Sequence, residues 1–84
     1  MNSELYMIAN RGCDDTTYCV AQLPKANKDF LSLFFEYINQ NSTYGCMPKI
    51  EFCNFEEVEV SEEDMVYMTS LHIVKYKGKY YRER

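Results

Sequence analysis

The spacing of apolar residues divides the first half of the chain into two strands and a helix. Residues 5–9 are mostly apolar, and residues 16–23 alternate between two faces, as strands do. The Asn-Arg-Gly-Cys-Asp-Asp run between them is dense in residues that form turns. This pattern predicts a β-hairpin.

A helical period follows Pro24, which ends the second predicted strand. We expect Asn27 to be the N-cap of a helix that extends to about Gln40. Its apolar residues recur three and four positions apart, so they form one stripe, which we expect to pack on the sheet. The stripe consists of Phe30, Leu31, Leu33, Phe34, Tyr37 and Ile38.

The second half of the chain returns to alternation, with an interruption. Residues 49–55 alternate as a strand does, but polar residues then enter the apolar phase, which predicts a bulge or break near Asn54. Ser61, followed by three acidic residues, has the form of a helix start, and we expect a short helix to about Thr69.

The last segments predict a second hairpin and complete the fold. Residues 71–76 and 79–81 are the expected strands, joined across Lys77-Gly78. With 84 residues, the chain is long enough for one domain. We therefore expect a single α+β domain in the order β-β-α-β-(short helix)-β-β, with a mainly antiparallel sheet and the amphipathic helix packed across it.

Chain direction places two polar loops together in this fold. The first strand runs toward the turn at residues 10–16, and the helix climbs back to the same end, where residues 41–48 follow it. Loops on a rigid scaffold often carry binding residues. They could equally close turns, with Arg11 paired to Asp14 or Asp15 and Cys13 and Cys46 filling gaps. The candidate ligand or partner site consists of Arg11, Cys13, Asp14, Asp15, Thr16, Ser42, Tyr44 and Cys46.

The formal net charge of -4 is unevenly distributed. An acidic segment spans residues 51–64, and a basic tail spans residues 75–84. The two could pair as neighbours in a sheet, or the acidic segment could face a basic partner. The candidate acidic partner surface consists of Glu56, Glu57, Glu59, Glu62 and Glu63. The basic tail also interleaves Lys, Arg and Tyr, as in single-strand nucleic-acid platforms, although an edge hairpin protected by lysines explains it better, so we do not expect a nucleic-acid partner.

The sequence contains little that indicates a catalytic or metal-binding site. The four cysteines lack the close pairs typical of structural zinc. The only histidine, His72, falls in an apolar strand, and no glycine-rich phosphate loop is present. We expect no enzyme activity, cofactor or metal.

Neither an export signal nor an 18-residue apolar run is visible, so we expect a cytoplasmic protein with reduced thiols and no membrane partner.

The segments Asn-Arg-Gly-Cys-Asp-Asp-Thr-Thr (10–17) and Asn-Ser-Thr-Tyr-Gly-Cys-Met-Pro (41–48) resemble small uncharacterised proteins of phages and prophages of low-GC Gram-positive bacteria. The resemblance covers roughly the first sixty residues. It implies a phage accessory protein, a class that includes host-takeover factors and anti-defence proteins such as anti-CRISPRs.

These observations predict a non-enzymatic protein, a monomer or homodimer, that inhibits or redirects a host protein by stoichiometric binding. The first alternative is a protein that binds or sequesters a small ligand or nucleotide with the loops at 10–16 and 41–48, as a homo-oligomer. The second alternative is a small nucleic-acid binder that uses the basic C-terminal hairpin.

Overall fold

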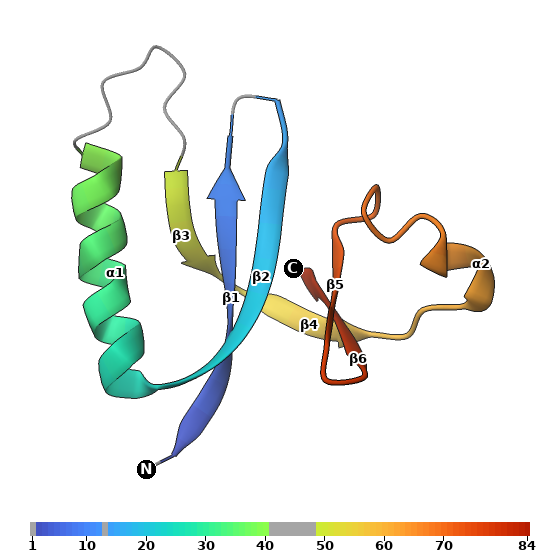
Figure 1. Ribbon diagram of the computed structural model, residues 1–84, viewed down its shortest axis with the longest axis horizontal. Helices are drawn as coiled ribbons and strands as arrows, with labels where there is room; N and C mark the ends of the chain where they lie inside the picture. The colour runs from blue at the N-terminus through green and yellow to red at the C-terminus, as the bar shows by residue number, and fades with distance from the viewer. Residues whose placement is uncertain (1, 13, 41–48) are drawn as a thin grey trace.

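The computed structural model describes residues 2–12, 14–40 and 49–84, and it has the expected α+β class (Figure 1). Strands and helices follow the predicted order, with one strand more than expected. The elements are β1 (Ser3–Arg11), β2 (Thr16–Pro24), α1 (Lys25–Gln40), β3 (Lys49–Cys53), β4 (Phe55–Val58), α2 (Glu62–Met65), β5 (Ile73–Tyr76) and β6 (Lys79–Glu83).

The strands form two antiparallel sheets of three strands, in the orders β2-β1-β3 and β4-β6-β5. The predicted first hairpin is confirmed, because β1 and β2 pair from Ser3↔Pro24 to Arg11↔Thr16. The predicted break near Asn54 is also confirmed. It separates β3, which pairs with β1, from β4, which pairs with β6. One interrupted strand therefore passes from the first sheet into the second.

The hydrophobic core lies between the two sheets. Met7 on β1, Val20 on β2 and Tyr81 on β6 are its buried members. Phe55 packs edge-on against the Tyr81 ring, with ring centroids 5.8 Å apart. Alternation along each strand brings these residues to one face, as expected for a strand that is covered on that side. The partly buried residues around them are Leu5, Tyr18, Cys53, Phe55, Val74 and Tyr76.

Helix α1 lies alongside β3 (Figure 1), and it contacts the face of the β2-β1-β3 sheet that carries Tyr6 and Phe52, opposite the core. The rings of Phe35 and Phe52 lie 5.5 Å apart, and the Lys28 ammonium lies 5.3 Å from the centroid of the Phe52 ring. The helix begins at Lys25, so the prediction of Asn27 as its N-cap was wrong. Pro24 has a fixed φ that suits the start of a helix, so the strand leads directly into α1.

The apolar stripe of α1 does not pack on the sheet as one unit. Leu31 and Ile38 are half-buried, as expected. Most of the stripe instead faces outward, which corrects the prediction that all of it covers the sheet. The outward residues are Phe30, Leu33, Phe34 and Tyr37, which are 69%, 68%, 50% and 64% exposed.

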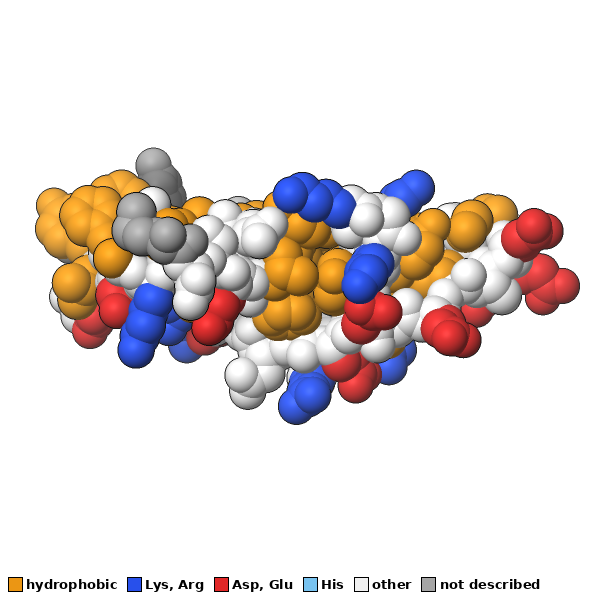
Figure 2. Space-filling view, turned by 90° about the horizontal axis from the view of Figure 1, so that it is seen from below, with side chains coloured by type: hydrophobic (Ala, Val, Ile, Leu, Met, Phe, Trp, Pro, Cys, Tyr) orange, Lys and Arg blue, Asp and Glu red, His pale blue; other side chains and the backbone are white. Residues whose placement is uncertain are grey.

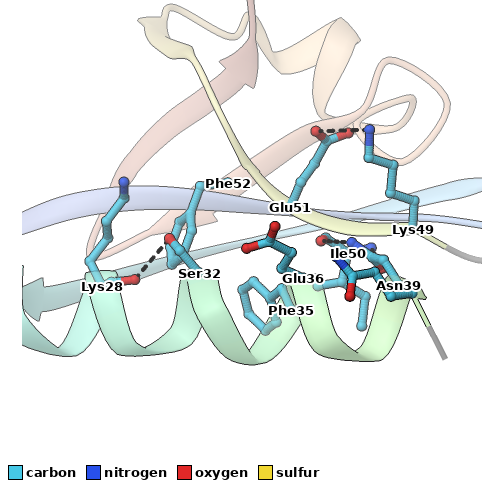
Figure 3. A pocket seen from close by; sticks show the side chains of 10 residues that line it. Lys28, Ser32, Phe35, Glu36, Asn39, Lys49, Ile50, Glu51 and Phe52 are labelled. Atoms are coloured by element: carbon cyan, nitrogen blue, oxygen red, sulfur yellow. Dashed lines mark hydrogen bonds and ion pairs between the residues drawn. The ribbon is translucent and has the colours of Figure 1, made fainter.

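Asn39 lies on the side of α1 that faces the sheet. Its side-chain amide donates to the carbonyl of Ile50 at 2.9 Å and accepts from the Ile50 backbone N–H, also at 2.9 Å (Figure 3). The pair completes the outer edge of β3, which otherwise would expose a donor and an acceptor. Asn39 and Phe35 thus share the side of α1 that faces β3, and the side that carries Phe30 and Leu33 is turned away from the sheet.

Replacement of Asn39 by alanine should lower the free energy of unfolding by about 1–2 kcal/mol, because both Ile50 backbone groups lose their partner. Urea denaturation measures the change. Asn27→Ala is the matched control, since Asn27 is an exposed residue of the same helix. Equal destabilisation by the two variants would contradict the role given to Asn39.

The segment after β4 differs from the prediction. Ser61 does cap α2, because its hydroxyl accepts from the Asp64 N–H at 3.3 Å. The helix ends at Met65 rather than near Thr69, and residues 66–72 form turns instead, in a segment where Val66, Tyr67 and Thr69 have low helix propensity. The second hairpin is confirmed, and its turn has positive φ at Lys77 and Gly78. No helix in the described part of the chain is long and apolar enough to cross a membrane.

Candidate functional site

The turn between β1 and β2 lies where the sequence placed it. Arg11 pairs with Thr16 on β2 and with Lys49 at the start of β3. The end of α1 reaches the same end of the sheet (Figure 1). Of the predicted loop site, Arg11, Asp14, Asp15 and Thr16 are described. Its other members, Cys13, Ser42, Tyr44 and Cys46, lie outside the described residues, so their contribution stays a prediction.

Arg11 does not pair with Asp14 or Asp15, which was one expectation. Its Nε donates to Glu51 at 2.7 Å, and its Nη1 and Nη2 donate to the two carboxylate oxygens of Glu83. Strand alternation directs Arg11 toward the second sheet, because Arg11 shares its face of β1 with Met7. The guanidinium therefore joins β1, β3 and β6.

Three side chains near Arg11 have pKa values that differ from their ordinary values. Its hydrogen bonds hold the pKa of Glu83 below the ordinary value. Burial raises the pKa of Tyr18, whose hydroxyl donates to Glu83 at 2.8 Å. Burial also raises the pKa of Cys53 to about 11, with a further contribution from the charge of Glu83. Cys53 is therefore a neutral thiol at pH 7. All three guanidinium nitrogens of Arg11 donate hydrogen bonds within the fold.

A cleft of about 340 Å³ lies beside this cluster, between β2 and β5. His72 is at its rim, in a turn with φ 58° and not in a strand, which corrects the prediction. Its Nε2 lies 3.8 Å from Asp15 Oδ1, and its ring centroid lies 5.5 Å from that of Tyr18. Sequence reasoning missed this cluster, although Thr69 and Ser70 before His72 are turn-forming residues.

A second cleft, of about 500 Å³, separates α1 from β3 (Figure 3). Its polar groups are largely used within the fold. Asn39 bonds to Ile50, and Glu51 contacts both Arg11 and Lys49, the latter at 3.7 Å. Within residues 2–12, 14–40 and 49–84, no three His, Cys, Asp or Glu side chains come together as metal ligands.

The acidic segment divides into a paired part and an unpaired part. Glu56 lies 3.4 Å from Arg82, and Glu57 lies 3.7 Å from Lys79, across the β4–β6 ladder. These are the sheet neighbours that the sequence offered as one explanation of the charge pattern. The carboxylates of residues 59–64 are exposed and form no ion pair with any residue that the structure describes. They are Glu59, Glu62, Glu63 and Asp64.

Large apolar side chains follow these unpaired acids directly. Met65, Val66, Tyr67 and Leu71 are 46%, 80%, 60% and 44% exposed. Acidic and apolar side chains gather side by side at the end of the molecule that carries α2 (Figure 2). Sequence reasoning missed the apolar part, although the run from Met65 directly after three acids signalled it. The α2 surface consists of Glu59, Glu62, Glu63, Asp64, Met65, Val66, Tyr67 and Leu71.

The basic side chains of the β5–β6 hairpin contact aromatic rings of the same hairpin and acids of β4. The Lys75 ammonium lies 5.8 Å from the Tyr80 ring centroid, and that of Lys77 lies 5.4 Å from the Tyr76 ring. Lys79 and Arg82 pair with acids of β4. These contacts match an edge hairpin better than an open stacking platform.

Comparison of the chain with protein-family models, with curated proteins and with solved structures gives no match. The candidate surfaces therefore rest on the geometry alone.

Proposed function

We propose that this chain is a non-enzymatic binding protein that occupies a basic surface of another protein through the α2 surface. The observation that carries the proposal is the juxtaposition of four unpaired acids with four exposed apolar side chains over residues 59–71. Of the predicted acidic partner surface, Glu59, Glu62 and Glu63 remain available, whereas Glu56 and Glu57 are paired with β6.

The composition of the α2 surface supports a protein partner. Protein interfaces typically combine a desolvated apolar centre with a polar rim, and Tyr and Met are enriched in them. Val66 and Tyr67 supply apolar area, and the neighbouring acids would speed the encounter with a positively charged partner. The resemblance of residues 10–17 and 41–48 to phage accessory proteins adds that the partner is a host protein, with defence effectors among the candidates.

The small-ligand alternative loses its principal charged donor. Arg11 is the one cationic residue in the sequence of the loops at 10–16 and 41–48, and its nitrogens donate to Glu51 and Glu83. A ligand at residues 10–16 would have to displace both carboxylates. This cost favours a protein-binding function on the α2 surface.

The proposal is tested by measuring how much partner protein the wild type and charge-altered variants retain. Tagged chain is incubated with lysate of a low-GC Gram-positive bacterium, and bound protein is quantified against bait. We expect one host protein at a fixed ratio to the bait. Glu62→Lys with Glu63→Lys should weaken its retention at least about tenfold, and raised salt should weaken retention by the wild type.

The matched control is Asp29→Lys with Glu36→Lys, which makes the same charge change on exposed residues of α1. Retention by this control should equal that of the wild type, apart from a small effect of net charge. Equal loss in both double variants would show that net charge alone, and not the α2 surface, determines binding. Absence of any stoichiometric partner would also contradict the proposal.

A further inference from the structure

The outer face of α1 carries four large apolar side chains that are half or more exposed. Phe30, Leu33 and Phe34 are 69%, 68% and 50% exposed, and Tyr37 continues the same row at 64%. They recur at i, i+3, i+4 and i+7, so they lie along one side of the helix. Figure 2 shows these hydrophobic side chains gathered at the α1 end, opposite the acidic end of the molecule.

The fold on its own buries little to offset this exposure. Met7, Ala9, Val20 and Tyr81 are the buried apolar residues in the described part of the chain, and none of them belongs to α1. The accessible surface is 6324 Å². A folded monomer of this mass typically exposes about 5,200 Å². This excess of roughly 1,100 Å² is spread over the whole chain, and a dimer interface at α1 that buries the standard ~800 Å² of each copy would remove much of it.

We propose that a second copy of this chain packs on the outer face of α1, so that the protein is a two-fold symmetric dimer. In such a dimer the same surface serves both subunits, so the apolar row of one helix meets the apolar row of the other. Leu33 and Phe34 lie at the centre of the row and Phe30 and Tyr37 at its ends. Permanent homodimer interfaces are apolar in this way, like a domain core cut in two.

The distribution of charge favours a dimer interface at α1 over one at the α2 surface. The two helices lie at opposite ends of the molecule, along its longest dimension of 42 Å (Figure 1). Pairing through α1 therefore keeps the acids at 59–64 of the two copies far apart. Pairing through the α2 surface would bring eight carboxylates together, counted as four from each copy, and like charges in contact oppose association. The dimer also leaves both α2 surfaces available for the proposed partner.

The test is the mass of the full chain in solution. Sedimentation equilibrium at about 10–100 μM should give twice the chain mass of 10.0 kDa. Leu33→Lys places a charge at the centre of the row and should raise the dissociation constant of the dimer at least about 100-fold. Val66→Lys is the matched control, because Val66 is an exposed apolar residue at the other end of the molecule, and this variant should remain a dimer.

A second measurement uses the wild type alone, in case Leu33→Lys does not fold. The thermal midpoint of a dimer rises with protein concentration by mass action, so it should increase between 5 and 100 μM, roughly a twentyfold range. A wild-type mass of one chain at 100 μM, or a midpoint independent of concentration, would overturn the proposal. Equal dissociation caused by Leu33→Lys and Val66→Lys would overturn it as well. If Val66→Lys remains a dimer but no longer captures the host protein, the dimer proposal is supported, and the loss of capture is an effect on the α2 surface alone.

Discussion

Replacement of Met7 by alanine should lower the free energy of unfolding by about 3 kcal/mol, the largest effect expected from one substitution in this chain. Met7 has no exposed surface, and it is the largest fully buried side chain among the described residues. It lies between the sheets, against Val20 and Tyr81. Its truncation removes apolar contacts to both sheets at once and leaves a cavity that β-strands cannot easily close.

This loss is large relative to the stability available. A domain of 84 residues typically has about 8 kcal/mol of unfolding free energy, so Met7→Ala would remove over a third of it. The measurement is urea denaturation at one fixed protein concentration, because association also contributes to stability. Met65→Ala is the matched control. Met65 is 46% exposed, so the same truncation should cost less than about 1 kcal/mol. Similar losses at both positions would show that the core does not lie between the sheets.

Local sequence patterns were sufficient for the α+β class and for the order of most elements. Alternation predicted β1 and β2 and the turn between them, and the polar residue at Asn54 predicted where one strand leaves the first sheet. These features depend on neighbours within a few residues, which is the range over which periodicity and turn chemistry act. The same reasoning placed the end of α1 beside the β1–β2 turn.

The orientation of α1 could not be predicted from its periodicity. The apolar residues of the helix span more than half of its circumference, and the pattern does not say which part faces the sheet. The sheet-facing side carries Phe35, which packs on Phe52, and Asn39, which forms two hydrogen bonds with the backbone of Ile50. That contact joins a polar side chain to a strand edge eleven residues away, and no local signal marks it. The exposed face of α1 was therefore not predicted.

The partners of Arg11 illustrate the same limit at the candidate site. The sequence suggests its neighbours Asp14 and Asp15, whereas the fold supplies Glu51 and Glu83, which are 40 and 72 residues away. Their approach requires both sheets to be in place. The unpaired acids at 59–64 were also indistinguishable from Glu56 and Glu57 until the β4–β6 register assigned the latter to Lys79 and Arg82.

Replacement of Arg11 by methionine should lower the free energy of unfolding by about 2 kcal/mol at pH 7. The substitution keeps much of the apolar side chain but leaves Glu51 and Glu83 near each other without their shared cation. The cost is below that of a fully buried pair, because these side chains are 23–33% exposed. Arg82→Met is the matched control. Its pair with Glu56 is more exposed, so the loss should be under about 1 kcal/mol.

The effect of Arg11→Met should disappear in acid. Because Arg11 holds the pKa of Glu83 below its ordinary value, the unfolded chain binds that proton more readily than the folded chain does. The interaction is therefore complete above the ordinary glutamate pKa of about 4.3, and it is lost as the pH falls through the lower folded pKa. Urea denaturation of wild type and variant at pH 7, 5, 4 and 3 measures this, with the stability difference constant down to pH 5 and shrinking below 4. A difference that stays constant to pH 3 would show that Arg11 stabilises the two sheets by packing and not through the charge of Glu83.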